Sequence, residues 1–236
     1  MQERNSATMP QERNFIYEVS QVINSDLFLE QILEDVVKLT AQQTGSKICS
    51  MMLLDDHKQY LSIKATQSLS KEYKNKPPVK VTQSLSGRAL IQKQPIQVLD
   101  VVADPAYQYP QVARAIGIRS LAAIPMYYQN TPIGVINCYT EDEHIFSPDE
   151  LQKLSAVASL AALAISNVRL TGERDQAYQE LETRKKVEKA KGIIMKRQNV
   201  TEDVAYRLLQ KTSMDKRIGL GEVAEIVIVA DGISAA

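Results

Sequence analysis

The fold of the last part of the chain is decided by the stretch VEKAKGIIMKRQNVTEDVAYRLLQKTSMDKRIGLGEVAEIVI, residues 187–228. Thr201 precedes two acidic residues, the pattern of a helix N-cap with an acidic first turn at the positive end of the helix dipole. Apolar residues then recur at helical spacing, namely Val204, Ala205, Leu208 and Leu209. One helix is expected to end near Asn199 and another to begin near Leu220, so that three helices share one small core.

Positive charge is concentrated in the same part of the chain. Residues 184–217 contain eleven basic and four acidic side chains, a net charge of +7, whereas the whole chain has 28 of each and no net charge. A basic face attracts phosphates whatever the rest of the protein carries, so nucleic-acid binding is expected here. A charge run on a helix can also be only a solvated face, and charge alone leaves both interpretations open.

The order of the motifs AKGIIMKR, TEDVAYRLLQKTSMDKR and GEVAE resembles the ANTAR family, the RNA-binding antitermination modules of bacterial regulators. The resemblance implies binding of paired hairpins in nascent transcripts, so that a terminator cannot form, and it implies no catalysis. The residues expected to contact RNA are Lys189, Lys191, Gly192, Lys196, Arg197, Arg207, Lys211, Lys216 and Arg217. The apolar motif residues are assigned to the core, namely Ala190, Met195, Ala205, Leu208, Leu209, Met214, Val223 and Ala224.

Three positions of this motif allow a more specific interpretation. Glycine costs about 1 kcal/mol in a helix relative to alanine, so Gly192 indicates close approach either of RNA or of another backbone. Tyr206 is expected to be a half-buried ring over the core, with stacking on an RNA base as the alternative. Lys211 stands where many ANTAR sequences have arginine. Lysine keeps the positive charge but lacks the planar guanidinium group that makes bidentate contacts to a phosphate or a guanine.

The composition of the chain bounds the class of the protein. A length of 236 residues with 44% hydrophobic and 24% charged residues gives room for one domain of ordinary size and a small appendage. There is no apolar run of about 18 residues and the N-terminus is polar, so neither a membrane span nor a secretory signal is expected, and the protein is predicted to be cytoplasmic. Cys49 and Cys138 are expected to be free buried thiols.

The first two-thirds of the chain alternate between helical and β patterns. Residues 14–43 predict two helices separated by a cap at Ser25 and Asp26. Residues 99–120 are expected to be irregular. A central antiparallel sheet is expected from the β patterns at residues 48–54, 61–66, 79–81, 121–127 and 133–140, which include two hairpins.

A long helix is predicted to begin at Ser147 and Pro148, because proline is favoured at the first helical position. Its apolar residues lie three and four apart, as in the seam of a helix–helix interface: Leu151, Leu154, Ala158, Ala161, Ile165 and Val168. A second stripe near the N-terminus contains Phe15, Val19, Val22 and Ile23. Together they predict a homodimer, since a monomer would leave both stripes exposed. After Leu170 the helix becomes polar and is expected to connect two domains.

Residues 28–170 resemble a GAF domain, a small-molecule sensing relative of the PAS fold. The resemblance is carried by SLSGRALIQKQPIQVLDVVADPAY, then GIRSLAAIPMYYQNTPIGVINCYTED, then FSPDELQKLSAVASLAALAISN. It implies a possible small-molecule effector, held between the sheet and residues 99–120. The expected pocket residues are Tyr107, Tyr109, Arg114, Arg119, Ser120, Tyr127 and Asn137. Arg119 is expected to bind an anionic ligand or to form a salt bridge with Asp100 or Asp104.

Several kinds of ligand do not fit the residues. A covalent bilin needs a loop cysteine, whereas both cysteines lie in strand patterns. His57 and His144 are isolated, so no haem or metal site is expected. The cyclic-nucleotide motif of GAF domains has lysine where this chain has Cys138. No cofactor and no catalytic residue are therefore predicted.

The sequence predicts an α+β GAF domain, with a central antiparallel sheet and flanking helices, joined by a long helix to a small all-α three-helix ANTAR bundle. The expected boundaries are an N-terminal helix at 1–27, the GAF domain at 28–170, a helical linker at 171–183 and the ANTAR domain at 184–236. The expected function is signal-responsive transcription antitermination through hairpin RNA, without enzyme activity or membrane binding. Two alternatives are a GAF-type free methionine sulfoxide reductase using Cys49 and Cys138, and a DNA-binding helix-turn-helix regulator.

Overall fold

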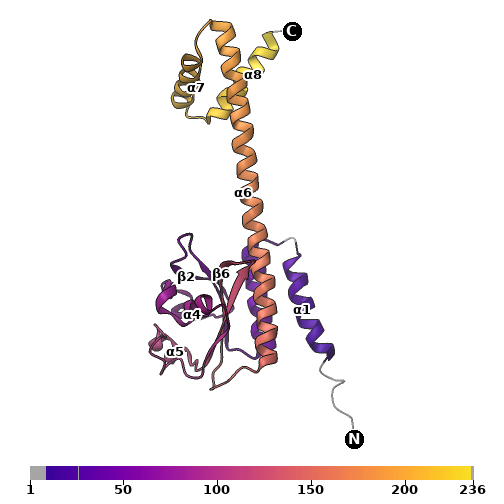
Figure 1. Cartoon of the computed structure of the whole chain (residues 1–236), viewed down its shortest axis with the longest axis vertical. Coiled ribbons are helices and arrows are strands. Elements are labelled where there is room, and N and C mark those ends of the chain that lie inside the picture. The colour runs from indigo at the N-terminus through magenta and orange to yellow at the C-terminus, as the bar shows by residue number, and fades with distance from the viewer. Residues whose placement is uncertain (1–8, 26, 235–236) are drawn as a thin grey trace. The chain divides into compact units, whose positions relative to one another are not determined.

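The computed structural model describes residues 9–25 and 27–234, which form two compact units. The first unit is Met1–Val168 and the second is Arg169–Ala236. One continuous helix, α6 (Pro148–Gln198), contributes residues to both units (Figure 1). The predicted N-terminal helix corresponds to α1 (Met9–Ile23), and residues 1–8 and 26 of that prediction lie outside the described part.

The first unit is built on one antiparallel sheet with the strand order β3-β2-β1-β6-β5-β4. The two predicted hairpins are confirmed, with Ser50 of β1 opposite Thr66 of β2 and Ala123 of β5 opposite Asn137 of β6. The strands are β1 (Ile48–Leu54), β2 (Tyr60–Thr66), β3 (Val79–Lys80), β4 (Ile96–Val98), β5 (Leu121–Tyr128) and β6 (Thr131–Tyr139). The edge strand β4 was not predicted, because three residues are too few to show an alternating pattern.

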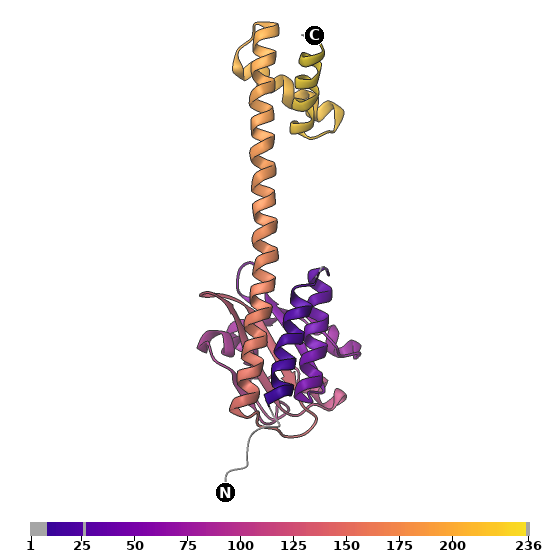
Figure 2. The same cartoon turned by 90° about the vertical axis from the view of Figure 1, so that its right-hand side faces the viewer.

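Both faces of the sheet are covered, which explains why every residue of the central strand β1 is buried. Cys49, Met51 and Leu53 of β1 face the layer formed by α1, α2 (Leu29–Thr44) and the first part of α6, which lie side by side in Figure 2. Ile48 and Met52 face the other layer, which contains three shorter helices. These are α3 (Lys71–Lys74), α4 (Leu85–Gln92) and α5 (Pro110–Ile116), with a 3-10 turn η1 (Val81–Gln83) before α4.

The second layer corrects the prediction that residues 99–120 are irregular. Pro110 stands at the start of α5 and Gly117 ends it with a left-handed φ of 67°, which are the usual punctuation marks of a helix. Seven helical residues are too few for a clear apolar periodicity, and the two signals were missed. The neighbouring α4 packs closely on η1, because a Cβ on Gly87 would lie 1.9 Å from the carbonyl oxygen of Val81. Only glycine fits there.

The start of α2 also differs from the prediction. Ser25 donates to the carbonyl of Val22 at 2.6 Å and so belongs to the end of α1, while Asp26 lies outside the described residues. Phe28 is the N-cap of α2, and its backbone N–H donates to Gln31 Oε1 at 3.3 Å. A glutamine three residues along therefore supplies the cap that was expected from a serine or an aspartate.

The apolar stripe predicted to form a dimer seam is used inside the chain, which corrects that prediction. Leu154, Ala158, Ala161 and Ile165 are at most 1% exposed and pack with Phe15 and Val19 in the core of the first unit. The helix lies on the sheet, so these four residues have no face left for a second chain, and only Val168 at the end of the stripe is exposed, at 49%. An 18-residue window of α6 has the hydropathy of a membrane span. α6 also contains the buried core stripe, and the core helix of a globular domain can have the same hydropathy as a membrane span.

The second unit contains the last part of α6, α7 (Glu202–Lys216) and α8 (Leu220–Ser234). The predicted helix end near Asn199 and the predicted start near Leu220 are confirmed. Asn199 and Arg217 both have a left-handed φ, 50° and 55° respectively, and each ends a helix. Thr201 is the N-cap of α7 as predicted, but its side chain makes no capping hydrogen bond.

Candidate nucleic-acid interface and sensor pocket

The helical unit is held together by a small apolar core at the meeting point of its three helices. The buried residues are Val187, Ala190, Ile194, Ala205, Leu209, Val223 and Ala224. Three of the residues assigned to this core are instead exposed, with Met195 at 36%, Leu208 at 37% and Met214 at 74%. Leu208 lines an open groove of about 630 Å³ between the helices, together with Ile226 and Val227. Helical spacing could not separate this groove from the core, because both lie on the apolar side of α7.

Lys191 is placed inside the helical unit and is 8% exposed. Its ammonium group forms ion pairs with Glu188 at 2.7 Å and with Glu202 at 2.6 Å. Glu202 opens α7, so the pair ties the start of that helix to α6. Hydrogen bonds to the two carboxylates raise the pKa of Lys191, and the same contact lowers the pKa of Glu202. Glu202, which the sequence predicts to interact favourably with the positive end of the α7 dipole, is thus also the ion-pair partner of Lys191.

Three further cations of the basic stretch have acidic partners. Lys185 pairs with Glu182 at 2.8 Å, Lys186 with Glu225 at 2.7 Å and Arg197 with Asp231 at 2.6 Å. The last two pairs join α6 to α8. Glu225 and Asp231 lie outside residues 184–217, over which the net charge of +7 was counted. That count therefore overstated the positive charge that the helical unit presents.

The remaining cations are exposed, and within the described part of the chain none of them forms an ion pair. Arg207 and Lys211 lie one turn apart on α7, which puts both on one side of that helix. Lys216 ends α7 and Arg217 caps it. The full set is Arg184, Lys189, Lys196, Arg207, Lys211, Lys216 and Arg217.

Gly192 and Tyr206 lie on the surface of the helical unit. A Cβ on Gly192 would meet no atom within 4 Å, so among the described residues no backbone approaches it. The ring of Tyr206 is 38% exposed, and the Lys191 ammonium lies 6.0 Å from its centre. The sequence predicted a half-buried ring over the core, whereas Tyr206 is exposed and lies outside the apolar core of the helical unit.

The tie between Lys191 and Glu202 gives a prediction about pH. A lowered pKa of Glu202 contributes stability above the ordinary glutamate pKa of about 4.3, and this contribution is lost as the pH falls through the lowered value. In urea unfolding followed by helical circular dichroism, the wild type should lose more unfolding free energy than Lys191→Met between about pH 6 and about pH 2. Lys189→Met, at an exposed position, is the control and should follow the wild type. Equal losses in all three proteins would contradict the tie.

Three of the predicted pocket residues lie in one region, on the α4/α5 side of the sheet. Tyr107 is buried and Tyr109 is half-buried, and both line a narrow gap there. Asn137 of β6 is fully buried and accepts a hydrogen bond from Ser86 of α4 at 2.9 Å. Ser86 lines the same gap, so Asn137 stands directly behind its wall.

The other four predicted pocket residues lie elsewhere. Arg114 is exposed at the end of α5, and Arg119 is exposed and pairs with Asp100 at 3.0 Å and with Glu143 at 2.5 Å. The salt bridge to Asp100 is the alternative that the sequence left open for Arg119. The hydroxyl of Tyr127 donates to the carbonyl of Leu90 at 2.5 Å, which holds β5 to α4.

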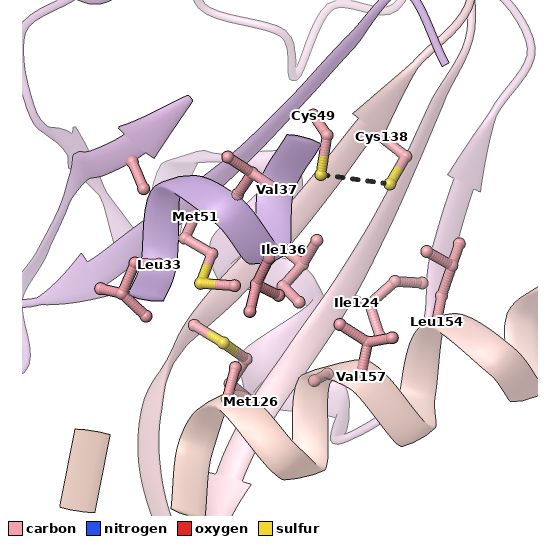
Figure 3. Packing of buried hydrophobic residues seen from close by; sticks show 14 of the residues in the cluster. Leu33, Val37, Cys49, Met51, Ile124, Met126, Ile136, Cys138, Leu154 and Val157 are labelled. Carbon is pink, nitrogen blue, oxygen red and sulfur yellow. Dashed lines mark hydrogen bonds between the residues drawn. The ribbon is translucent and has the colours of Figure 1, made fainter. Parts of the chain in front are cut away.

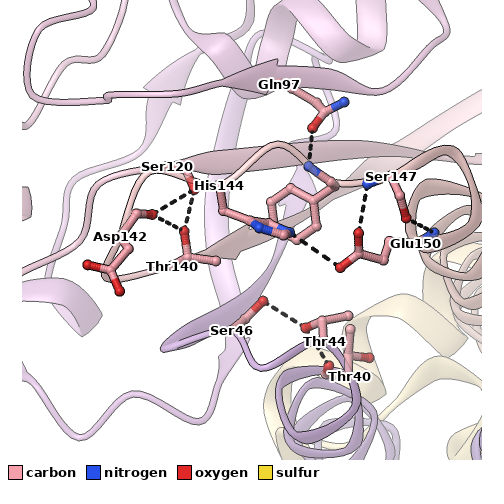
Figure 4. A network of polar contacts seen from close by, with 11 residues as sticks. Thr40, Thr44, Ser46, Gln97, Ser120, Thr140, Asp142, His144, Ser147 and Glu150 are labelled. Atoms are coloured by element: carbon pink, nitrogen blue, oxygen red, sulfur yellow. Dashed lines mark hydrogen bonds and ion pairs between the residues drawn. The ribbon is translucent and has the colours of Figure 1, made fainter.

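Ser120 belongs to a structural network of hydroxyl groups. Its buried side chain bonds that of Thr140, which donates to the carbonyl of Asp142 at 2.7 Å (Figure 4). Figure 4 also shows His144 bonded to Glu150, whose other oxygen accepts from the Ser147 backbone at 2.7 Å. These contacts fix the turn that leads into α6. The described residues contain no cluster of three or more metal-ligating side chains.

The sequence did not single out Tyr73, Lys76 and Tyr139, which complete the gap around Tyr107. Tyr73 and Tyr139 are at most 2% exposed, and their ring centres lie 5.9 Å apart in an edge-to-face arrangement. The signal for Tyr139 was its spacing of two residues from Asn137, which puts both on one face of β6. Tyr73 and Lys76 lie in a polar stretch that ends in two prolines, and nothing in that pattern indicated burial.

The two cysteines lie on the opposite face of the sheet. Cys49 and Cys138 are cross-strand neighbours on β1 and β6, both free, fully buried and 3.8 Å apart at sulfur (Figure 3). They are surrounded by apolar side chains from α2, α6 and the sheet, including Val37 and Leu154. Burial raises the pKa of the Cys49 thiol well above its ordinary value. This is the environment of an inert thiol, whereas a reductase needs an accessible thiolate.

The burial of the cysteines predicts their reactivity. In the native protein, Ellman's reagent should label Cys49 and Cys138 more slowly than a free thiol by orders of magnitude. The reagent reacts with an exposed thiolate, whereas these thiols are buried and burial keeps them protonated. In guanidinium chloride both should be labelled at once, which serves as the internal control. Rapid stoichiometric labelling of the native protein would favour the reductase alternative.

Comparison with known proteins assigns a family to each unit. Residues 26–166 match the model of the GAF domain and residues 175–228 match that of the ANTAR domain. The transcriptional regulatory protein PdtaR of Mycobacterium tuberculosis is 40% identical over 70 residues, which are 28% of this chain and 34% of the relative. The chain therefore spans about a third of the length of the curated relatives it matches.

Solved structures agree with the fold of the first unit. The GAF domain of a phosphoenolpyruvate-protein phosphotransferase from Coxiella burnetii has a TM-score of 0.63 at 24% identity and covers 71% of this chain and 99% of its own. A free methionine-R-sulfoxide reductase from Neisseria meningitidis in complex with its substrate has a TM-score of 0.60 at 16% identity, and covers 72% and 98%. At these identities the likeness describes the fold alone.

Proposed function

Because the chain belongs to the GAF domain family and carries an ANTAR domain after its GAF domain, we propose that it is a cytoplasmic regulator of transcription antitermination. In this proposal the ANTAR domain binds hairpin RNA in nascent transcripts and the GAF domain, as a sensor, controls that binding. The proposed boundaries are 28–170 for the GAF domain, 171–183 for the helical linker and 184–236 for the ANTAR domain. The protein carries out no catalysis.

The observation that carries the proposal is the set of exposed cations without acidic partners on the helical unit. A phosphate backbone is bound by cations that are free to meet it, and each such contact releases condensed counterions. Arg207 and Lys211 on α7, with Lys216 and Arg217 at its end, form the proposed centre of the contact. Lys189 and Lys196 on α6 extend it, and Gly192 offers an open backbone between them. Lys191 and Arg197, held by acids, position the helices instead.

A homodimer is part of the proposal, on a different surface from the stripe that is buried in the core. A second stripe on α6 follows a heptad repeat, alternating steps of four and three residues. We name it the outer stripe, and it contains Ala156, Leu160, Leu163, Asn167, Leu170, Arg174, Ala177 and Leu181. Its leucines Leu163, Leu170 and Leu181 are 42%, 51% and 48% exposed.

The residues of the outer stripe favour a parallel two-stranded coiled coil. Asn167 and Arg174 occupy positions of the a type, where a polar residue fixes the register at some cost in stability. Ala156 and Leu160 are half-buried beside α1, whereas the stripe from Leu163 to Leu181 is exposed on a single α6 helix. A second copy of the chain covers this exposed part.

The test of RNA binding compares three nucleic acids of one sequence with the full chain. Fluorescence anisotropy should give tightest binding for a hairpin RNA with an unpaired loop, and weaker binding for the fully paired RNA and for the DNA duplex. The logarithm of the affinity should fall with the logarithm of the salt concentration by about 0.7 to 0.9 per neutralised phosphate. Equal or tighter binding of duplex DNA would favour a helix-turn-helix regulator and overturn the proposal.

A further inference from the structure

The interior of the GAF domain contains a narrow gap of about 20 Å³, bounded by aromatic rings. Tyr107 and Tyr139 form its inner wall, with ring centres 6.3 Å apart, and Tyr73 packs against Tyr139. Two serines of the α4 start, Ser84 and Ser86, form its polar side. No acidic side chain lines the gap, and its described lining is Met52, Lys76, Val79, Ser84, Leu85, Ser86, Ala106, Tyr107, Gln108, Tyr109, Leu121 and Tyr139.

One positive charge points into this aromatic lining without a counter-ion. The ammonium of Lys76 lies 4.2 Å from the ring centre of Tyr73, and 5.6 or 5.7 Å from those of Tyr107, Tyr109 and Tyr139. Ring faces attract an ammonium group but accept no hydrogen bond as strong as that of a carboxylate. Among the described residues Lys76 forms no ion pair and no hydrogen bond. Burial lowers the pKa of Lys76 to about 8.

Two buried polar atoms at or behind the wall of the gap have no partner at full hydrogen-bond geometry among the described residues. Tyr107 is 8% exposed, and its hydroxyl has only the neighbouring Tyr139 to interact with, a contact that together with burial raises the pKa of Tyr107. The amide nitrogen of Asn137 behind Ser86 is likewise without an acceptor. Each such group costs free energy when buried, so a native protein normally provides a partner. Lys76, Tyr107 and Asn137 can all donate, and what they lack is an acceptor.

The roof of the gap is held by apolar packing of Ala106 and Tyr109 and by two hydrogen bonds. The hydroxyl of Tyr109 donates to the carbonyl of Pro77 at 3.2 Å, and Gln108 Nε2 donates to the carbonyl of Gln83 at 3.2 Å. These two bonds join the segment before α5 to the segments around β3 and η1. Both hydrogen bonds are exposed to solvent, so breaking them leaves no buried polar group unpaired. The inference below requires this roof to move, because the gap of about 20 Å³ is smaller than an organic acid.

We propose that this gap is the closed form of the GAF effector pocket and that its effector is a small organic acid, whose carboxylate binds Lys76 and the hydroxyl of Tyr107. The inference rests on the sensor role given above to the GAF domain. A carboxylate supplies both the missing charge and the missing acceptors, and the tyrosine rings enclose the apolar part of the acid. A cationic effector would have to displace Lys76 and would leave the donors unpaired.

The test uses the full chain and ligands that differ only in charge. Butyrate, butyramide and butylammonium form one series, and benzoate, benzamide and benzylammonium form another. Calorimetry gives the affinities, and tyrosine fluorescence is a second signal, because four of the ten tyrosines lie around Lys76 and the chain has no tryptophan. The two carboxylates should bind at least about tenfold more tightly than their amides, since an ion pair with a buried ammonium adds more than about 1.4 kcal/mol. Tighter binding of the ammonium compounds, or equal binding within each series, would overturn the proposal.

Variants identify the residues. Lys76→Met should abolish the preference for carboxylates, and Tyr107→Phe should weaken carboxylate binding while keeping the ring. Lys74→Met, at an exposed position of α3, is the matched control and should bind as the wild type does. Carboxylate binding unchanged in Lys76→Met would overturn the assignment of this pocket.

The pH dependence gives a second readout that a merely structural role of Lys76 would not produce. Between pH 7 and pH 9 the wild type should lose carboxylate affinity by about tenfold, because Lys76 loses its proton near pH 8. The titratable side chains shown beside the Lys76 ammonium are Tyr73, Tyr107, Tyr109 and Tyr139, whose ring centres lie 4.2 to 5.7 Å from it. Burial raises the pKa values of Tyr73, Tyr107 and Tyr139. A pH-independent affinity in the wild type would contradict the role of Lys76. Hairpin RNA binding is measured in the same preparations. RNA binding without carboxylate selectivity refutes this inference alone, and absence of RNA binding refutes the proposed function.

Discussion

Replacing Leu163 and Leu170 by glutamate is expected to convert the dimer into monomers. Both residues lie on the outer stripe at d positions, where each side chain would face its own copy across the two-fold axis. Glutamates there bring like charges together in a desolvated seam, at a cost of several kcal/mol. The dissociation constant should rise at least about 1000-fold, which corresponds to about 4 kcal/mol. Sedimentation equilibrium at micromolar concentration measures the change.

A matched variant separates the seam from the charge. Gln176→Glu combined with Gln179→Glu adds the same two negative charges to exposed positions of α6 that lie off the outer stripe. This control should remain dimeric. Dissociation of the control together with the leucine variant would assign the effect to general repulsion. A wild type that is monomeric throughout the concentration range would refute the coiled coil.

Removing Arg207 and Lys211 is expected to weaken hairpin RNA binding by about 10- to 100-fold, as the loss of two phosphate contacts. Both side chains are exposed, so their replacement by alanine should leave the helical content unchanged. The slope of affinity against salt, on logarithmic axes, should become shallower by about 1.4 to 1.8, because two fewer counterions are released. Anisotropy titrations at several salt concentrations measure both quantities.

The control for this experiment is provided by the paired lysines of α6. Lys185→Ala combined with Lys186→Ala removes the same number of charges, but Glu182 and Glu225 already balance them. The control should lose little affinity and keep the salt slope. If both double variants weaken binding equally, RNA responds to total charge, and the assignment of α7 as the contact surface is wrong.

The sheet could be predicted from the sequence because the signals of its strands and turns are local. An apolar run at β1 and a second β pattern at β2, with turn residues between them, predict a hairpin without any knowledge of the rest of the chain. The ANTAR core was predictable to the same degree, with Ala190, Ala205 and Leu209 buried as assigned. Met195 and Met214 were misassigned because a flexible apolar side chain at a motif position says little about its depth.

The features that were not predictable depend on contacts between distant residues. The sequence shows that Lys191 is basic, but its pair with Glu202 forms only when α7 folds back on α6. Similarly, Lys76 meets Tyr107 and Tyr139 only because the sheet and the segment before α5 meet there. Helical spacing found an apolar stripe on α6, yet it could not tell which of two stripes packs on the sheet. The answer depends on the sheet, which lies outside the helix.

Every residue from 167 to 185 of α6 is exposed, which gives this stretch a property of its own. An isolated helix in water is only marginally stable, and packing supplies most of the stability of helices in proteins. In the proposed dimer that packing comes from the second chain, so the ordered fraction of the stretch follows protein concentration by mass action. In the proposed regulator, coupling of the GAF domain to the ANTAR domain through this stretch would therefore strengthen as the protein concentration rises.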